Sequence, residues 1–361
     1  MKTESLYVHI PFCDNICTYC DFAKVYYSGE LADRYLVALF DELRRRAQNR
    51  YKTIYIGGGT PSALDESQLE TLLQGLQDYL EHGAEFTIEA NPESLKPGKI
   101  ALLKKYRVNR VSLGVQTFNE DLLQSLNRRH NNAMVDETVA LLKKAGIANI
   151  NIDLMYGLKG QTMADIKNDL DHLINLDVPH VSYYSLILEE HTMIARESYP
   201  ELEDESLGEI SKLIDGCLEA NGYKHYEVSN YAKLGFESRH NLAYWHYCNY
   251  LGVGVGAASK IDDRIIQNNR NLYKYLGGEN IQEVSEQSQK ETMFNHIMMS
   301  LRLKEGLDLE GFNQRYQVDF EKFYRKVLAK HLGHTMMIRD GFLVLSKNAY
   351  DNLNSILVDF L

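Results

Sequence analysis

The sequence has little of what a secreted or membrane-embedded protein needs. Its 361 residues include only five cysteines, an odd number that argues against a disulfide framework. No apolar run approaches the roughly 18 residues of a membrane-spanning helix, and the first residues lack the long apolar segment of a signal peptide. We therefore expect a cytoplasmic protein, and these observations leave peripheral contact with a membrane open.

Basic residues are scarce relative to acidic ones. The chain has 39 Lys and Arg against 50 Asp and Glu, a formal net charge of -11. A surface this acidic repels phosphate backbones. The short basic runs at 44–46 and 127–130 are typical of solvated helix faces. We therefore expect no nucleic-acid partner, and modification of RNA is disfavoured as a function.

What the chain does contain is a regular alternation of short β-rich runs and longer helical patterns. The expected strands are 6–10, 53–56, 85–89, 110–115, 150–155 and 181–187. The expected helices are 31–46, 66–80, 99–106, 119–126, 133–144, 163–176 and 207–220. Repeated β-then-α units predict a parallel sheet with right-handed crossovers, and six are fewer than the eight of a closed barrel. The predicted fold class is α/β, an open partial (βα)6 barrel.

The alternation stops near residue 223, which predicts three parts. Residues 1–222 form the partial barrel, and residues 223–288 form a connecting region with an aromatic stretch and a glycine-rich segment. A helical pattern resumes from about residue 289, with a short strand at 341–345. We expect residues 289–361 to form a small α-rich, winged-helix-like C-terminal domain.

Three cysteines lie close together after the first expected strand, in the pattern Cys13-x3-Cys17-x2-Cys20. Thiolates are soft ligands that select iron–sulfur clusters, zinc or copper(I). A structural zinc site and a [4Fe-4S] cluster normally take four protein ligands. A cube held by three thiolates leaves one iron open for a substrate or cofactor. The alternative is a zinc site completed by His9 or Asp14.

This cysteine spacing resembles the defining motif of the radical S-adenosylmethionine (SAM) superfamily. The resemblance implies a [4Fe-4S] cluster whose open iron binds the amino and carboxylate groups of SAM. Electron transfer from the cluster then cleaves the sulfonium and releases a 5′-deoxyadenosyl radical. The run 57–62, Gly-Gly-Gly-Thr-Pro-Ser, resembles the segment that contacts the methionyl amino group. Taken alone, that run indicates only a tight loop with Pro61 starting a helix.

Longer stretches narrow the resemblance to the oxygen-independent coproporphyrinogen III oxidase-like family. They are 7–13, 19–22, 57–62, 89–93, 114–118 and 156–158, and the resemblance runs over nearly the whole chain. In the oxidase, the positions matching Gln116, Arg128 and Asp153 contact SAM, where a second SAM has been placed. The SAM-contacting residues implied by this resemblance are Tyr7, Tyr19, Gly58, Gly59, Thr60, Glu89, Gln116, Arg128 and Asp153.

Two marks of the true oxidase are missing. The oxidase carries another cysteine two residues after the third one, whereas Asp21 and Phe22 follow Cys20 here, and only 12 residues precede Cys13. The run 240–245, His-Asn-Leu-Ala-Tyr-Trp, fits H-N-x-x-Y-W. That pattern resembles the signature of the haem chaperone branch of the family, HemW. The predicted function is a haem chaperone, and the alternative is radical decarboxylation of coproporphyrinogen III.

The chemistry of this motif suits haem. A neutral imidazole is a good axial ligand for haem iron, so His240 is the predicted iron ligand, with His246 and Cys248 as rivals. In a helix, His240 and Tyr244 would share a face, and the indole of Trp245 could pack on a porphyrin. Arg239 could reach a propionate. The alternative is an aromatic hinge with a structural His240.

Other expectations concern the cofactors and partners. The cofactors are a [4Fe-4S] cluster, SAM and haem. The resemblance suggests respiratory, membrane-bound haemoproteins as acceptors, together with an electron donor, and a homodimer stays open. SAM cleavage in the working cycle also stays open, while coproporphyrinogen oxidase activity is disfavoured. Cys217, inside a helical pattern, is expected to be a core residue.

Overall fold

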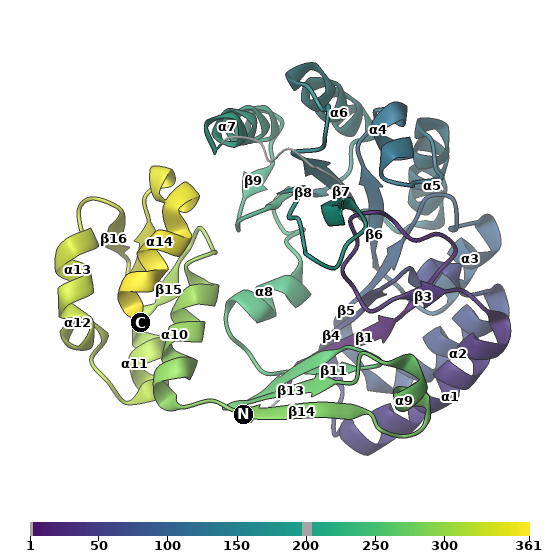
Figure 1. Ribbon diagram of the computed structural model, residues 1–361, viewed down its shortest axis with the longest axis horizontal. Helices are drawn as coiled ribbons and strands as arrows, with labels where there is room; N and C mark the ends of the chain where they lie inside the picture. Colours follow the sequence, from purple (N-terminus) through teal and green to yellow (C-terminus); the bar gives the residue numbers. More distant parts are fainter. Residues whose placement is uncertain (1–2, 197–203) are drawn as a thin grey trace.

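A computed structural model describes residues 3–196 and 204–361, and a long curved sheet organises most of them (Figure 1). The six predicted strands are present and pair in parallel, each with the next. Their bounds are β1 (Ser5–Ile10), β4 (Tyr51–Gly58), β5 (Leu80–Ala90), β6 (Arg110–Gln116), β7 (Asn149–Tyr156) and β8 (His180–Ser185). The predicted open parallel arrangement is therefore confirmed, and the sheet does not close into a barrel.

The predicted helices cover the outer face of this sheet (Figure 1). They are α1 (Gly29–Arg46), α2 (Glu66–Leu76), α3 (Pro97–Lys105), α4 (Glu120–Ser125), α5 (Asn132–Ala145), α6 (Met163–Leu176) and α7 (Asp204–Ala220). Local sequence sets their ends: Asp65 and Thr162 form capping boxes with the third residues of α2 and α6. Gly146, at φ 87°, ends α5 in the left-handed conformation.

The segment predicted to connect the two domains is part of the same sheet. On one edge, β11 (Tyr250–Val253) pairs in parallel with β1. The antiparallel strands β12 (Ala258–Ile261), β13 (Arg264–Asn268) and β14 (Ile281–Glu286) follow it. On the other edge, β10 (Asn230–Ala232) pairs antiparallel with β8, and β9 (Lys224–His225) with β10. The sequence pattern misses these strands because they are short and no long helix separates them.

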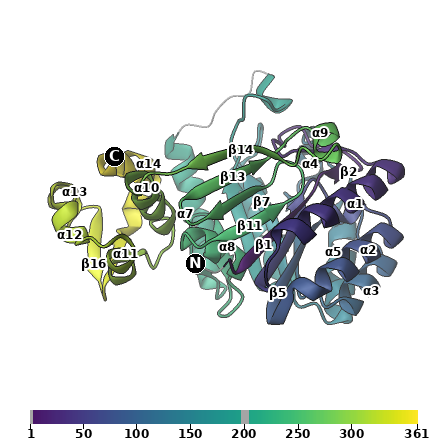
Figure 2. The ribbon, with the colours of Figure 1, turned by 90° about the horizontal axis from the view of Figure 1, so that it is seen from below.

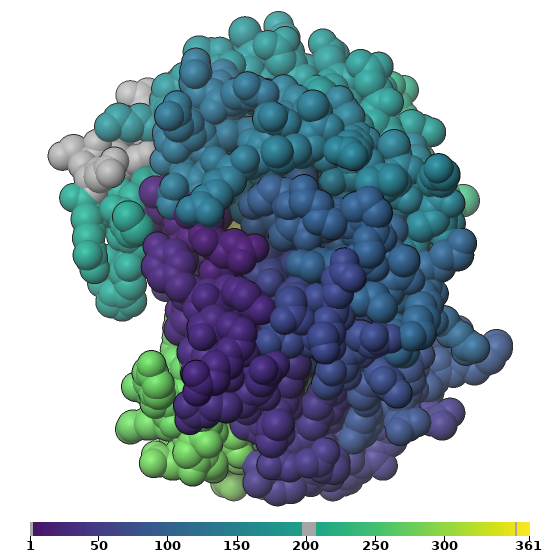
Figure 3. Space-filling view, turned by 90° about the vertical axis from the view of Figure 1, so that its right-hand side faces the viewer, coloured from purple at the N-terminus to yellow at the C-terminus, as the bar shows by residue number. Residues whose placement is uncertain are grey.

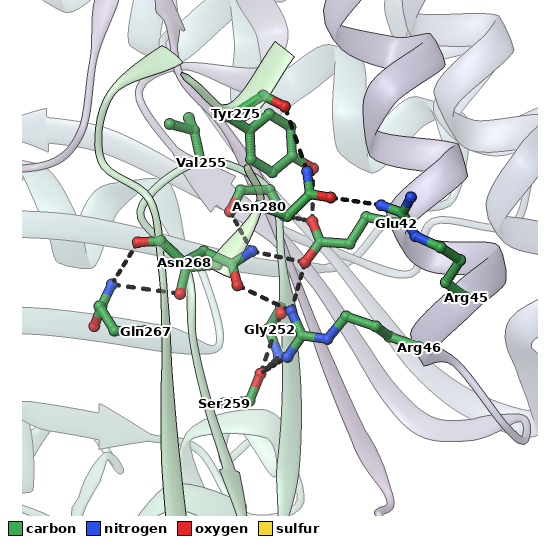
Figure 4. A network of polar contacts seen from close by, with 12 residues as sticks. Glu42, Arg45, Arg46, Gly252, Val255, Ser259, Gln267, Asn268, Tyr275 and Asn280 are labelled. Atoms are coloured by element: carbon green, nitrogen blue, oxygen red, sulfur yellow. Dashed lines mark hydrogen bonds and ion pairs between the residues drawn. The ribbon is translucent and has the colours of Figure 1, made fainter. Parts of the chain in front are cut away.

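A polar network fixes this extension to the first helix (Figure 4). Its centre is the fully buried carboxylate of Glu42 on α1, which accepts hydrogen bonds from the backbone N–H of Gly254, the amide of Asn268 and the hydroxyl of Tyr275. Arg46 adds an ion pair. A buried charge is stable only when it is paired in this way, so the network fixes the position of the turn after β11.

The C-terminal residues form a separate unit with its own core (Figure 2). Its helices are α10 (Gln289–Ser300), α11 (Leu309–Tyr316), α12 (Phe320–Phe323), α13 (Arg325–His331) and α14 (Leu353–Leu357). A three-stranded antiparallel sheet of β15 (Leu307–Asp308), β17 (Phe342–Leu345) and β16 (Met336–Arg339) accompanies them. The predicted α-rich C-terminal domain is therefore confirmed.

Segments that are distant in the sequence meet on one face of the molecule. In Figure 3, the purple N-terminal region lies beside the green region that follows residue 250, as the pairing of β1 with β11 requires. Within the described parts of the chain, no helix has both the length and the apolar character of a membrane span.

Candidate cluster and ligand cleft

A cleft of about 470 Å³ at the carboxyl ends of the parallel strands brings most of the predicted site residues together. This volume is in the usual range for small-molecule sites. From the predicted set, the residues on its surface are Cys13, Cys17, Tyr19, Cys20, Gly58, Gly59, Thr60, Glu89, Gln116, Arg128, Asp153 and Trp245. A hollow of about 600 Å³ between α1 and α2 contains no cysteine among its lining residues.

The three cysteines lie on a loop that its backbone holds in place. Cys13 ends β2 (Phe12–Cys13), which pairs with β3 (Val25–Tyr26). The N–H of Cys20 donates to the carbonyl of Cys17. Cys13 is only 5% exposed, and burial raises the pKa of its thiol to about 12. A coordinated metal would favour the thiolate form of this sulfur against that burial.

The site fits an open cluster better than a structural zinc ion. His9, one proposed fourth ligand, is buried, and both of its ring nitrogens are hydrogen-bonded, to the hydroxyl of Tyr7 at 3.0 Å and the carbonyl of Ala23 at 2.7 Å. Asp14 is exposed and does not line the cleft. Among residues 3–196 and 204–361, no three His, Cys, Asp or Glu side chains converge on one metal position, as a zinc ion would need.

The glycine run is required by close contacts. Gly58 has φ +119°, a left-handed conformation, and a Cβ there would lie 2.5 Å from the ring of His9. A Cβ on Gly59 would lie 2.9 Å from the sulfur of Cys13 and 2.8 Å from the backbone of Pro11. The backbone of this loop therefore lies directly against the cysteine loop, where a side chain would fill the space.

Two partly buried carboxyls lie on the strands beside this loop. Glu89 accepts hydrogen bonds from the hydroxyl of Tyr55 at 2.8 Å and the N–H of Gly58 at 3.0 Å. Burial raises the pKa of Glu89 to about 7. Asp153 accepts from Ser112 at 3.0 Å and from Asn151, and burial also raises its pKa. Such carboxyls can bind ribose hydroxyls or a positive charge.

Arg128 and Gln116 complete this side of the cleft. Arg128 donates to the sulfur of Cys17 at 3.4 Å, to the side-chain oxygen of Asn91 at 3.0 Å and to the carbonyl of Gly114. Gln116 ends β6 at φ 75° and accepts from the hydroxyl of Tyr184 at 2.9 Å. We call the side formed by Glu89, Gln116, Arg128 and Asp153 the strand-end wall.

Tyr7 lies apart from the residues predicted with it. Its hydroxyl is bonded to His9, and its ring stacks 6.2 Å from that of Tyr55, beneath the cleft surface. A direct contact of Tyr7 with SAM stays a prediction, and the geometry indicates support for His9 and the glycine loop.

The H-N-x-x-Y-W motif forms a short helix, α8 (Arg239–Trp245), on the concave side of the sheet (Figure 1). His240 is 1% exposed, and its two ring nitrogens are hydrogen-bonded to the hydroxyls of Thr53 and Tyr244, both at 2.8 Å. Its ring stacks 5.1 Å from that of Tyr55. In this conformation both ring nitrogens of His240 are engaged, so haem ligation by His240 stays a prediction that requires the ring to leave Thr53 or Tyr244.

The motif has a second face, which the sequence analysis did not describe. Asn241 and Trp245 are also four residues apart, and both line the cleft that holds the cysteines. His240 and Tyr244, by contrast, do not reach its surface. The helix therefore has an anchoring pair on one face and a cleft pair on the next.

The other predicted haem residues lie elsewhere. His246 is exposed, 3.3 Å from Glu305, and Cys248 is exposed, and neither lines the cleft. Arg239 donates to the carbonyl of Gly83 and is also outside the cleft. Cys217, on α7, is partly buried against the main core.

Sequence analysis did not identify three further polar residues of the cleft. Glu227 precedes β10, Asn230 is its first residue, and Arg302 follows α10. Together with Asn241 and Trp245 they form what we call the α8 wall. The i, i+4 spacing could have identified Asn241 as the partner of Trp245, whereas nothing in the sequence around Arg302 distinguishes it from other helix-end arginines.

Comparison with known families agrees with the fold and the cysteine loop. The model of the radical SAM superfamily matches residues 7–173. The model of the HemN C-terminal domain matches residues 287–350.

Similar proteins cover nearly the whole chain. The heme chaperone HemW of Lactococcus lactis is 40% identical over 94% of this chain and 92% of its own length. The heme chaperone HemW of Escherichia coli is 36% identical over 84% of this chain and 83% of its own length. The solved structure of coproporphyrinogen III oxidase (HemN) from Escherichia coli, a radical SAM enzyme, matches with a TM-score of 0.86 at 23% identity, over 99% of this chain and 90% of that one.

Proposed function

The chain belongs to the HemW family within the radical SAM superfamily, and from this membership we propose that it binds haem and a SAM-ligated [4Fe-4S] cluster and passes the haem to acceptor haemoproteins. The acceptors we propose are respiratory and membrane-bound, and an electron donor serves the cluster. The relatives' name supports the haem role.

The radical SAM family implies a [4Fe-4S] cluster and SAM. Cys13, Cys17 and Cys20 would hold the cluster, and Gly58, Gly59 and Thr60 would bring backbone groups to SAM. Glu89 and Asp153 offer acceptor oxygens in the same cleft. When bound, SAM supplies a source of a carbon radical, while these residues bind and orient it.

One observation carries the haem proposal: Asn241 and Trp245 of α8 line the same cleft as the three cysteines. The motif that resembles the haem chaperone signature therefore contributes side chains to the cluster site. Trp245 offers a flat apolar face and an N–H donor, a combination that suits one edge of a porphyrin.

The test is an anaerobic haemin titration of the cluster-loaded protein, followed by its Soret band. We expect saturable binding of about one haemin per chain, and transfer of the band to an added apo-haemoprotein. Trp245→Ala should weaken binding, whereas His246→Ala, an exposed change outside the cleft, should not. Absence of saturable binding by the native chain would refute the proposal.

Coproporphyrinogen III oxidation is the second candidate, because HemN shares the fold. At 23% identity this likeness concerns the fold alone. The oxidase also carries a cysteine two residues after the third cluster cysteine, and this chain has Phe22 at that position. The same anaerobic samples should leave coproporphyrinogen III unconverted in the presence of SAM and a reductant. Its conversion, without haemin binding, would reverse the assignment.

A further inference from the structure

Arg302 is a half-buried cation on the cleft surface with no acidic partner of its own. Its guanidinium donates to the carbonyl of Met298 at 2.5 Å, and it forms no ion pair with any carboxylate in the described chain. Burial lowers the pKa of Arg302, and the charge that opposes this shift is that of the Glu227 carboxylate, which also lines the cleft. A guanidinium held in this way is suited to bind an incoming anion through paired N–H donors.

The position of Arg302 is coupled to the cleft pair of α8. The hydroxyl of Ser300, at the end of α10, donates to the carbonyl of Trp245 at 3.2 Å. Arg302 follows two residues later, so the C-terminal domain brings it to the end of α8. Trp245, Asn241 and Arg302 therefore belong to one surface, although they come from two domains.

The α8 wall also contains buried polar atoms that lack partners. The indole N–H of Trp245, one oxygen of Glu227 and the side-chain oxygen of Asn230 have no hydrogen-bond partner within the structure described. Glu227 is 1% exposed and Asn230 7% exposed. Native proteins leave few such atoms, and each usually marks a place for water, an ion or a ligand.

We propose that Arg302, with Asn241 and Trp245 beside it, binds a propionate of haem, so that the porphyrin enters the cluster cleft along the α8 wall. This inference rests on the proposed haem function and adds the part of the molecule that recognises the ligand. A planar macrocycle with carboxylate arms matches an indole face next to a guanidinium. His240 and Tyr244 act as positioning residues, because they fix α8 against β4 without touching the cleft.

Two ligands and three variants test this site. Haemin and haemin dimethyl ester, in which the propionates are neutral esters, are each titrated into the cluster-loaded protein. The variants are Arg302→Gln, Arg302→Lys and the matched control Arg239→Gln, whose guanidinium lies outside the cleft. Thermal unfolding of each variant checks that it is folded.

We expect the native chain to bind haemin about ten- to a hundredfold more tightly than the ester, as for a charge-assisted hydrogen bond. Arg302→Gln should lose this preference and leave the affinity for the ester unchanged. Arg302→Lys should keep part of it, and Arg239→Gln all of it.

Equal haemin affinity in Arg302→Gln and the native chain would overturn the inference and leave the haem function standing. An equal loss for both ligands in a folded Arg302→Gln would also overturn it, because it would show a general packing role. A lost preference in Arg239→Gln would move the contact to that residue. If the native chain bound neither ligand, the proposed function itself would fail.

Discussion

The two walls of the cleft differ in how completely their polar groups are paired. On the strand-end wall, Glu89 and Asp153 each accept two hydrogen bonds, and Arg128 has three acceptors, with only its Nε unpaired. On the α8 wall, Trp245 and Glu227 retain buried atoms without partners. The first wall is therefore built before any ligand arrives, whereas the second is completed by one.

This difference follows from how each wall is made. In the strand-end wall, Glu89, Gln116 and Asp153 lie on parallel strands whose register fixes their positions, and Arg128 lies between α4 and α5. The α8 wall combines a seven-residue helix, the short strand β10 with the turn before it, and the end of α10 in the next domain. A wall assembled from separate elements can adjust more readily to what it binds.

The largest effect is expected in the cysteine loop, where Arg128 of the strand-end wall contacts Cys17. Cys17→Ser should remove the cluster, so iron and labile sulfide fall from about four per chain to near zero after anaerobic reconstitution. The matched control is Cys217→Ser on α7, which should leave both contents unchanged because Cys217 lies outside the cleft. Full iron content in Cys17→Ser would show that this sulfur is not a ligand.

His240→Ala should lower the free energy of unfolding by about 2–4 kcal/mol, because it leaves a cavity and two unpaired hydroxyls. Exposed His246→Ala should change it by less than about 0.5 kcal/mol. Denaturant unfolding measures both. The spectrum of bound haemin should keep its axial-ligand signature in His240→Ala. Loss of that signature would mean that the His240 ring leaves Thr53 and Tyr244 to ligate the iron. His240 would then be a haem-binding residue and not a positioning residue.

Glu227→Gln tests the Glu227 carboxyl, one oxygen of which has no partner, by the pH dependence of stability. Burial raises the pKa of Glu227 from 4.5 to about 7. Between these values the folded state binds a proton that the unfolded state releases, so the free energy of unfolding falls as pH rises. Glu227→Gln has no carboxyl to titrate, so its free energy of unfolding does not fall in this way. Relative to the native chain, it should rise by up to about 1.4 kcal/mol per pH unit from pH 5 to 7. If the free energies of unfolding of the two proteins changed in parallel with pH, the pKa of Glu227 would not be raised in the folded state.

The smallest effect expected is that of Trp245→Phe. The indole N–H has no partner without ligand, so its removal should change the free energy of unfolding by less than about 0.5 kcal/mol. Haemin affinity should still fall by about 0.5–1.5 kcal/mol, the value of one hydrogen bond. Denaturant unfolding measures the effect on stability, and a haemin titration of the same variant measures the effect on affinity. A loss of stability with unchanged affinity would assign the indole to packing instead.

The sequence predicted the barrel because each of its strands is an apolar run followed by a helical pattern, which in α1, α2, α5, α6 and α7 is long and amphipathic. It predicted the strand-end wall because residues such as Glu89 and Asp153 end those strands, where ligands of parallel sheets bind. The strands between residues 223 and 288 escaped prediction, since they have only two to six residues each and no long helix separates them. Arg302 escaped because its place depends on how the two domains meet.

The six residues of the H-N-x-x-Y-W motif also show that a sequence pattern predicts local spacing but not tertiary contacts. Its helical spacing correctly paired His240 with Tyr244, as their 2.8 Å contact confirms. The pattern could not show which face of the helix would be turned to the cleft. That depends on tertiary partners: Glu85 accepts from the N–H groups of Arg239 and His240, and Thr53 receives the ring.

The place of β1 inside the sheet has a consequence for the order of assembly during synthesis. Leu6 pairs with Ile54 on one side and with Leu251 on the other. At about 5–20 residues per second, the ribosome delivers the second neighbour on the order of tens of seconds after the first. Until then one edge of the strand that leads into Cys13, Cys17 and Cys20 is unpaired, and α1 lacks the turn that Glu42 will hold. Throughout this interval the cysteine loop therefore follows a strand that has only one of its two neighbours.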